Sequence, residues 1–204
     1  MKILMILAAL LLSFASGVSR ADTEAGTSYF VSIGAYFAVP QTDITAIREQ
    51  GIPDEGIPVV FFVAQQAKVA PATIMEMRLK GQTWSEITAH YGFGPEIFYV
   101  PVEPNIEVGF PYDHAYGYYK DKPRNEWSSM YLQDAEIINL VNLKFLSEHF
   151  KYPANSIMKM RQADKRFYTI NDEIEKQKQV EKNPDHLTGT KKQFRKLSKF
   201  IKKI

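Results

Sequence analysis

Hydrophobic and polar residues follow the same spacing in two separate stretches of this chain. Residues 71–87 read PATIMEMRLKGQTWSEI, and residues 153–170 read PANSIMKMRQADKRFYTI. When the two stretches are aligned on Arg78 and Arg161, their isoleucines, methionines and aromatic residues coincide. Apolar residues three and four positions apart form one buried stripe on a helix. Each copy therefore predicts a short helix, a turn and a second helix.

A third, weaker copy, PQTDITAIREQGIPDEGI, aligns on Arg48. A proline opens every copy, and proline at the start of a helix already has the helical φ angle. Gly51 and Gly81 stand where a short helix needs a left-handed residue at its end. Thr83 and Glu86 have the spacing of a capping box, which starts the next helix. The three arginines either pair with acids and cover apolar surface or line a shared anion-binding face.

Longer segments with a 3.6-residue apolar period precede the copies, including residues 134–150 with Asp134 as the expected N-cap. Stacked units of this kind bury a continuous core. We therefore predict an all-α fold, a degenerate array of helix-turn-helix-like units in a single domain over residues 22–187. We expect a long, irregular, aromatic-rich insertion at 100–132 and a basic C-terminal helix at 188–204.

The first residues have the pattern of a secretory signal peptide. Lys2 is followed by a short apolar run, and Ser19 and Ala21 are the small residues of a cleavage site. The apolar run has 16 residues, fewer than the about 20 that a membrane-spanning helix needs. We expect cleavage near Ala21, a mature chain beginning near Asp22, and export to the periplasm or the medium. The alternative is an uncleaved N-terminal anchor.

The chain has no cysteine, which excludes disulfides and thiol chemistry.

Charge is distributed unevenly along the chain. Residues 188–204 carry seven Lys or Arg and no acid, whereas residues 22–187 carry 16 basic and 23 acidic residues. Such asymmetry indicates an anionic partner or self-docking of the tail on the acidic body.

Residues 84–99, WSEITAHYGFGPEIFY, resemble a helix-turn-helix element. The resemblance implies nucleic-acid binding as one alternative function. A recognition helix needs Arg, Lys, Asn or Gln to reach bases and phosphates. Here the corresponding stretch, GPEIFYVP, has one glutamate and no base. Together with the export signal, this composition leads us to expect a scaffold and no DNA.

The insertion at 100–132 shows neither a helical nor an alternating period. A long irregular stretch inside a compact domain is usually functional or disordered, and its aromatic residues indicate order. Three roles are open for this insertion: packing on the core, forming a binding surface, or forming a catalytic pocket. The candidate binding residues are Tyr112, His114, Tyr116, Tyr118, Tyr119, Lys120, Arg124 and Trp127.

Motifs of known catalytic sites are missing from the sequence. None of the four histidines forms H-x-x-x-H or H-E-x-x-H, and no Gly-rich phosphate loop or G-x-S-x-G appears. We expect no catalytic residues, no cofactor and no metal. The first hypothesis is an exported, non-enzymatic binding or scaffold protein whose partner is a protein, a polymer or an anionic envelope surface. The alternative is a hydrolase-like or metal-dependent enzyme that uses His114 and His149.

The C-terminal residues combine an apolar stripe with many cations, the pattern of a helix that lies in a membrane interface. The alternatives are docking on the chain's own acidic body and a disordered tail. A tail of this kind allows peripheral membrane contact, since each cation near an anionic surface contributes about 1 kcal/mol. Its cations are Lys191, Lys192, Arg195, Lys196, Lys199, Lys202 and Lys203.

Overall fold

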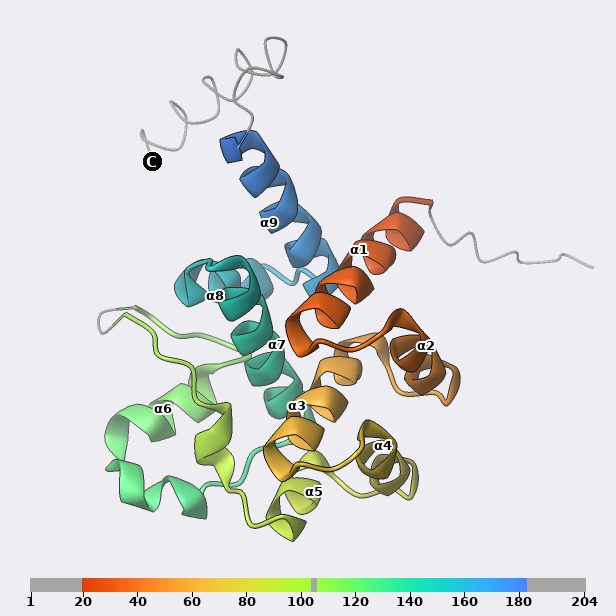
Figure 1. The fold of residues 1–204 in the computed structure, drawn as a ribbon. Coiled ribbons are helices and arrows are strands. Elements are labelled where there is room, and N and C mark those ends of the chain that lie inside the picture. Colours follow the sequence, from red (N-terminus) through yellow and green to blue (C-terminus); the bar gives the residue numbers. More distant parts are fainter. Residues whose placement is uncertain (1–19, 104–105, 183–204) are drawn as a thin grey trace, which may run out of the picture.

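The computed structural model describes residues 20–103 and 106–182, and within them it contains helices and no strand (Figure 1). The predicted all-α class is confirmed. Three short 3-10 helices, η1, η2 and η3, separate the α-helices. The elements are α1 (Arg20–Phe37), α2 (Gln41–Glu49), η1 (Asp54–Gly56), α3 (Ile57–Ala67), α4 (Pro71–Leu79), α5 (Trp84–His90), η2 (Pro95–Phe98), α6 (Asp113–Asp121), η3 (Arg124–Ser129), α7 (Asp134–Phe150), α8 (Ala154–Gln162) and α9 (Phe167–Lys182).

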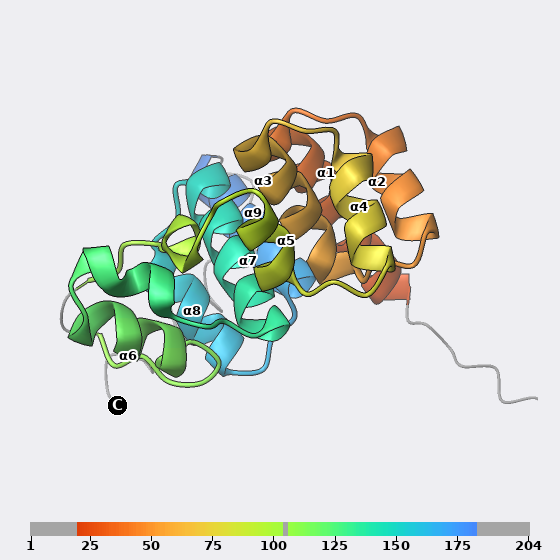
Figure 2. The ribbon, with the colours of Figure 1, turned by 90° about the horizontal axis from the view of Figure 1, so that it is seen from below.

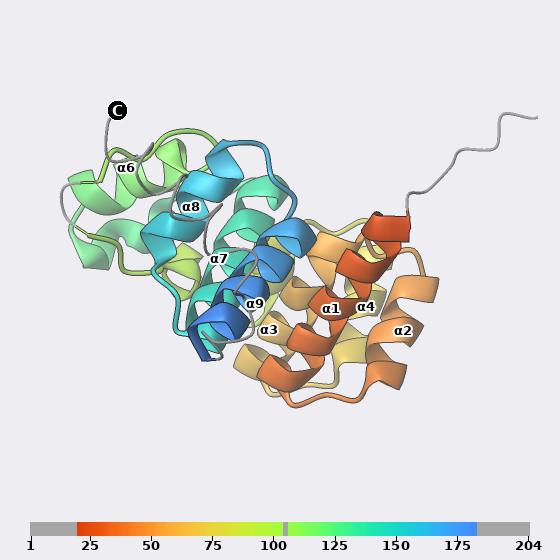
Figure 3. The same cartoon turned by 90° about the horizontal axis from the view of Figure 1, so that it is seen from above.

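Helices α3 and α7 form the centre of the molecule and pack against each other. Every residue of α3 from Ile57 to Ala64 is buried, because a helix that is apolar on all sides must be surrounded by protein. Figures 1 and 3 show α1 and α9 side by side next to this central pair. Figures 2 and 3 show α2 and α6 at opposite ends of the molecule.

Helices α2, α4 and α8 have nine residues each and recur with the same local backbone. The helix before each of them ends on a left-handed residue, Ala38, Lys68 or Lys151. As the glycine pattern predicted, Gly51 and Gly81 adopt a φ of +89° after α2 and α4. The predicted capping box of Thr83 and Glu86 at the start of α5 is also confirmed. The stacked array itself remains a prediction.

Arg78 and Arg161 make matching contacts, which we call the two arginine clamps. Arg78 donates to the carbonyl of Gln82 at 2.7 Å, lies over the Trp84 ring at 4.9 Å, and its Nη2 is 2.6 Å from Asp134 Oδ2. The other carboxylate oxygen of Asp134 accepts the backbone N–H of Trp84 at 2.8 Å. Asp134 is the first residue of α7, so this clamp ties α4 and α5 to the start of α7.

In the second clamp, Arg161 donates to the carbonyl of Lys165 at 3.1 Å and lies over the Phe167 ring at 4.8 Å. Its Nη2 is 3.7 Å from Glu55 Oε2, while Glu55 Oε1 accepts the backbone N–H of Phe167 at 3.0 Å. Glu55 lies in η1, directly before α3. The two clamps are therefore reciprocal: each ties a short helix and its successor to the start of the other central helix.

Arg48 has different surroundings from these two arginines. It pairs with Asp54 at 3.0 Å on the surface and lies over the Phe30 ring of α1 at 4.9 Å. All three arginines thus pair with acids and cover aromatic rings, as the first of the two interpretations predicted. They do not form a common face, because each is held by a carboxylate in a different place.

Three details of the sequence prediction were wrong. The insertion at 100–132 is not irregular throughout, since it contains α6 and η3. The helical period of α6 was present in the sequence, since its buried side carries Tyr112, Ala115, Tyr116 and Tyr119 at i, i+3, i+4 and i+7. The N-cap of α7 is Gln133, whose N–H bonds to Glu136; Asp134 instead serves the clamp. Residues 95–98 form a four-residue 3-10 helix, η2, where the resemblance placed a recognition helix.

Candidate functional site

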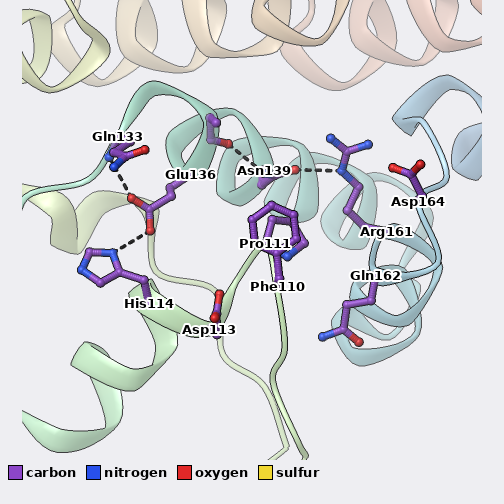
Figure 4. A pocket seen from close by; sticks show the side chains of 11 residues that line it. Phe110, Pro111, Asp113, His114, Gln133, Glu136, Asn139, Arg161, Gln162 and Asp164 are labelled. Atoms are coloured by element: carbon purple, nitrogen blue, oxygen red, sulfur yellow. Dashed lines mark hydrogen bonds and ion pairs between the residues drawn. The ribbon is translucent and has the colours of Figure 1, made fainter.

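A groove with a volume of about 600 Å³ opens where the start of α6, the first turns of α7 and the end of α8 meet. Figure 4 shows three parts of it. His114 and Glu136 form one side, Arg161 and Asp164 form the other, and Phe110 lies between them beside its neighbouring proline. The groove is thus built from segments as far apart in the chain as Phe110 and Asp164, and only the tertiary structure creates it.

On the first side of the groove, His114 of α6 contacts Glu136 of α7. His114 Nδ1 is 2.7 Å from Glu136 Oε1, and the other oxygen of Glu136 accepts the Gln133 N–H at 2.9 Å. Glu136 is therefore fixed from two directions, while the His114 ring stays largely in solvent. This pair positions the start of α6 against α7 and presents an imidazole at the rim.

The second side is a rigid polar wall. Arg161 Nε donates to Asn139 Oδ1 at 2.9 Å, and the Asn139 amide donates to the Ala135 carbonyl at 2.8 Å. The Arg161 guanidinium is also committed to its clamp with Glu55. Arg161 is thus held in place by Asn139, Lys165 and Glu55, and its positive charge is paired with the Glu55 carboxylate.

In the described part of the chain, the unpaired charges that line the groove itself are acidic, whereas the adjoining concavity has one unpaired charge of each sign, Glu107 and Lys159. Among the residues that the structure describes, Asp113 and Asp164 have no cationic partner, and neither does Glu107 in the adjoining concavity on the other side of Phe110. Lys159 also lines that adjoining concavity. With Arg161 and Glu136 paired, the remaining carboxylates make the groove favourable for a cationic group.

Phe110 is the most exposed of the large hydrophobic side chains described, at 82%. Two anchors hold it there. On one side the Gln162 amide donates to the Gly109 carbonyl at 3.2 Å, and on the other side Tyr112 is fully buried in the core. These contacts hold the backbone on both sides of Phe110, and its ring lies in solvent. Sequence reasoning missed Phe110 as a site residue, since only its place between a buried tyrosine and a helix-bound glycine reveals its exposure.

Most of the candidate aromatic residues pack inside the protein. Tyr112, Tyr116, Tyr119 and Trp127 are buried, and burial raises the pKa of the three tyrosines above the usual value. These hydroxyls are therefore protonated at neutral pH. Tyr116 donates to the Val100 carbonyl at 2.7 Å, Tyr119 to that of Pro95 at 2.8 Å, and Trp127 to that of Lys122 at 3.0 Å.

The other candidates in this segment lie outside the groove, except His114. Tyr118 bonds to the Ser129 hydroxyl at 2.7 Å and is half-buried. Arg124 lies over the Trp127 ring at 5.4 Å, and Lys120 is exposed. The segment therefore serves mainly as packing, and His114 alone among these candidates lines the groove.

His114 and His149 do not share a site, which corrects the hypothesis of an enzyme built on the pair. His114 contacts Glu136 in the first turn of α7, whereas His149 lies in its last turn against Phe145 and Phe150. Thirteen residues of helix between Glu136 and His149 correspond to about 20 Å. Acid–base partners must reach the same substrate atoms, and these two histidines cannot.

Two further features of the described part of the chain concern metal sites and membrane-spanning helices. Within residues 20–103 and 106–182, no group of three or more His, Asp or Glu side chains is arranged to hold a metal ion. In the same part of the chain, no helix combines the length and apolarity needed to cross a bilayer. The tail cations, Lys191 to Lys203, and residues 1–19 of the expected signal peptide at 1–21 lie outside the described residues.

Comparisons with protein-family models, curated proteins and solved structures found no match to this chain. The groove offers an exposed aromatic ring, unpaired carboxylates and a rim imidazole on a fixed frame, which is a combination suited to holding another molecule.

Proposed function

We propose that this chain is an exported, non-enzymatic binding protein that holds a segment of a partner protein in the groove beside Phe110. The observation that carries the proposal is the 82% exposure of the Phe110 ring beside the groove, between the hydrogen-bonded Gly109 carbonyl and buried Tyr112. Burying a phenylalanine side chain contributes about 1.5–3 kcal/mol. Because the Phe110 ring is exposed in the free protein, a partner that covers it gains this burial free energy on binding.

The groove also favours a particular partner chemistry. Binding energy at interfaces is concentrated in a few aromatic or arginine contacts within water-excluding surroundings. Here an aromatic ring lies beside the unpaired carboxylates Asp113 and Asp164. A peptide segment with apolar and cationic side chains complements both features, because a cation can contact the carboxylates and the face of the ring. Export follows from the sequence pattern before Asp22 and remains part of the proposal.

Peptide selection tests this function. The bait is the purified chain with its seven tail cations changed to glutamine, which removes the tail as a competitor for an acidic groove. A random peptide library should yield binders rich in Lys, Arg and apolar residues. Their affinity should fall about 10- to 100-fold in Phe110→Ala, the equivalent of losing about 1.5–3 kcal/mol.

Leu79→Ala is the matched control, since Leu79 is an exposed apolar residue on α4, outside the groove. Its affinity for the selected peptides should equal that of the parent chain. Peptides that bind Phe110→Ala as tightly as the parent would refute the proposed site. N-terminal sequencing of the native protein tests export separately, and a start near Asp22 is the expected result.

A further inference from the structure

The charge and apolar residues of the tail at 188–204 complement those of the groove. It carries seven cations and no acid, and Phe194, Leu197 and Ile201 follow a helical spacing between them. The groove presents the exposed Phe110 ring and unpaired carboxylates. Apolar contact with the ring and ion pairs with Asp113 and Asp164 would satisfy both surfaces at once.

The tail is also long enough to reach the groove. Helix α9 begins at Phe167, three positions after the groove residue Asp164, and its 16 residues carry the chain about 24 Å to Lys182. Residues 183–190 alone span up to about 26 Å when extended. The apolar and cationic residues that follow can therefore return to the groove of the same chain.

We propose that residues 188–204 occupy the groove of their own chain and cover Phe110 until a partner displaces them. This inference rests on the proposed function, because it assigns a resident segment to the same groove. An attached segment competes at a high effective concentration, so even weak contacts keep the groove closed to weak ligands. Salt weakens the closure, since ion pairs at an exposed groove are screened.

Paramagnetic labelling tests the contact directly. The chain has no cysteine, so Ser198→Cys provides a single position for a nitroxide label in the tail. Amide NMR signals at the start of α6 and the end of α8 should lose most of their intensity. Signals of α2 should keep theirs, because α2 lies at the opposite end of the molecule from α6 (Figures 2 and 3).

Two variants report on the specificity of the contact. Phe110→Ala should restore the intensity of the groove signals, and Leu79→Ala should leave their loss unchanged. Phe110 is exposed, so its loss should not prevent folding. Groove signals that keep their intensity in the labelled parent chain, or that are lost equally in Phe110→Ala, would overturn the inference.

Two further samples separate other occupants of the groove and other partners of the tail. In a mixture of isotope-labelled chain with spin-labelled chain, groove signals should be unaffected; their loss would assign the occupant to a second copy and overturn the intramolecular contact. With vesicles containing phosphatidylglycerol, a tail that binds lipid without ever having contacted the groove would likewise overturn it. Selected peptides that need Phe110, together with an unaffected groove in the labelled chain, would leave the proposed function standing and remove only this inference.

Discussion

At the scale of single residues, the surroundings of a side chain decide whether it is buried or exposed, even among residues of the same type. Tyr112 and Phe110 are aromatic residues two positions apart, yet one is buried and the other is the most exposed of the large hydrophobic residues described. The hydroxyl of Tyr29 bonds to buried Asn142, whose amide in turn donates to the Glu55 carbonyl at 2.8 Å. Burying such polar groups costs free energy unless they are hydrogen-bonded.

His149 gives a pH prediction at this scale. Burial against Phe145 and Phe150 lowers its pKa below the ordinary value of about 6.5, and Glu175 opposes this shift only in part. The folded state therefore binds fewer protons at this site than the unfolded state does. Stability from this site is present above about pH 6.5 and is lost as the pH falls below it.

Urea unfolding at several pH values measures this effect. The free energy of unfolding of the parent chain should decrease more between about pH 8 and about pH 5.5 than that of His149→Gln. The variant removes the imidazole of His149 and leaves the other histidines in place, so the difference between the two profiles reports on His149. Parallel pH profiles for the two proteins would contradict the assignment.

At the scale of the elements, capping residues and left-handed glycines decide where helices begin and end. Gly51 and Gly81 end α2 and α4 in the left-handed conformation, at the same φ of +89°. Thr83 and Glu86 then start α5 with reciprocal hydrogen bonds, and the same contact lowers the pKa of Glu86. These signals are local, so the sequence predicted them without knowledge of the packing.

Two glycines should respond to alanine with opposite signs. Gly81→Ala places a side chain in the left-handed region, which costs about 1–2 kcal/mol of stability. Gly117 lies inside α6 with open space around its Cα, so Gly117→Ala should stabilise the protein by about 0.5–1 kcal/mol. Denaturant midpoints of the two variants measure both effects. Equal signs would show that φ at Gly81 does not control the end of α4.

The whole molecule is tied together by the two arginine clamps. Asp134 and Glu55 each share their two oxygens between a guanidinium and a backbone N–H that opens the next helix. Each clamp joins segments far apart in the sequence, α4 and α5 to α7 in one case and α8 and α9 to α3 in the other. Loss of either arginine leaves a partly buried carboxylate without its cation.

Arg161→Ala should therefore lower the free energy of unfolding by about 2 kcal/mol, since it removes charged hydrogen bonds and the cover of the Phe167 ring. Arg48→Ala is the matched comparison. Arg48 is 57% exposed in its pair with Asp54, and exposed pairs contribute less than about 1 kcal/mol. Equal losses in the two variants, measured by urea unfolding, would show that the clamp is no stronger than a surface pair.

The sequence by itself determined the all-α class, the short helices at each copy, the glycine ends of α2 and α4 and the capping box before Trp84. These features depend on neighbours within about one helical turn, which a linear pattern records. The tertiary structure alone decided which carboxylate meets Arg78 and Arg161, which tyrosines are buried, and that Phe110 remains in solvent beside a groove. Those outcomes depend on contacts between residues as far apart as Glu55 and Phe167, and no local pattern encodes which distant segments will meet.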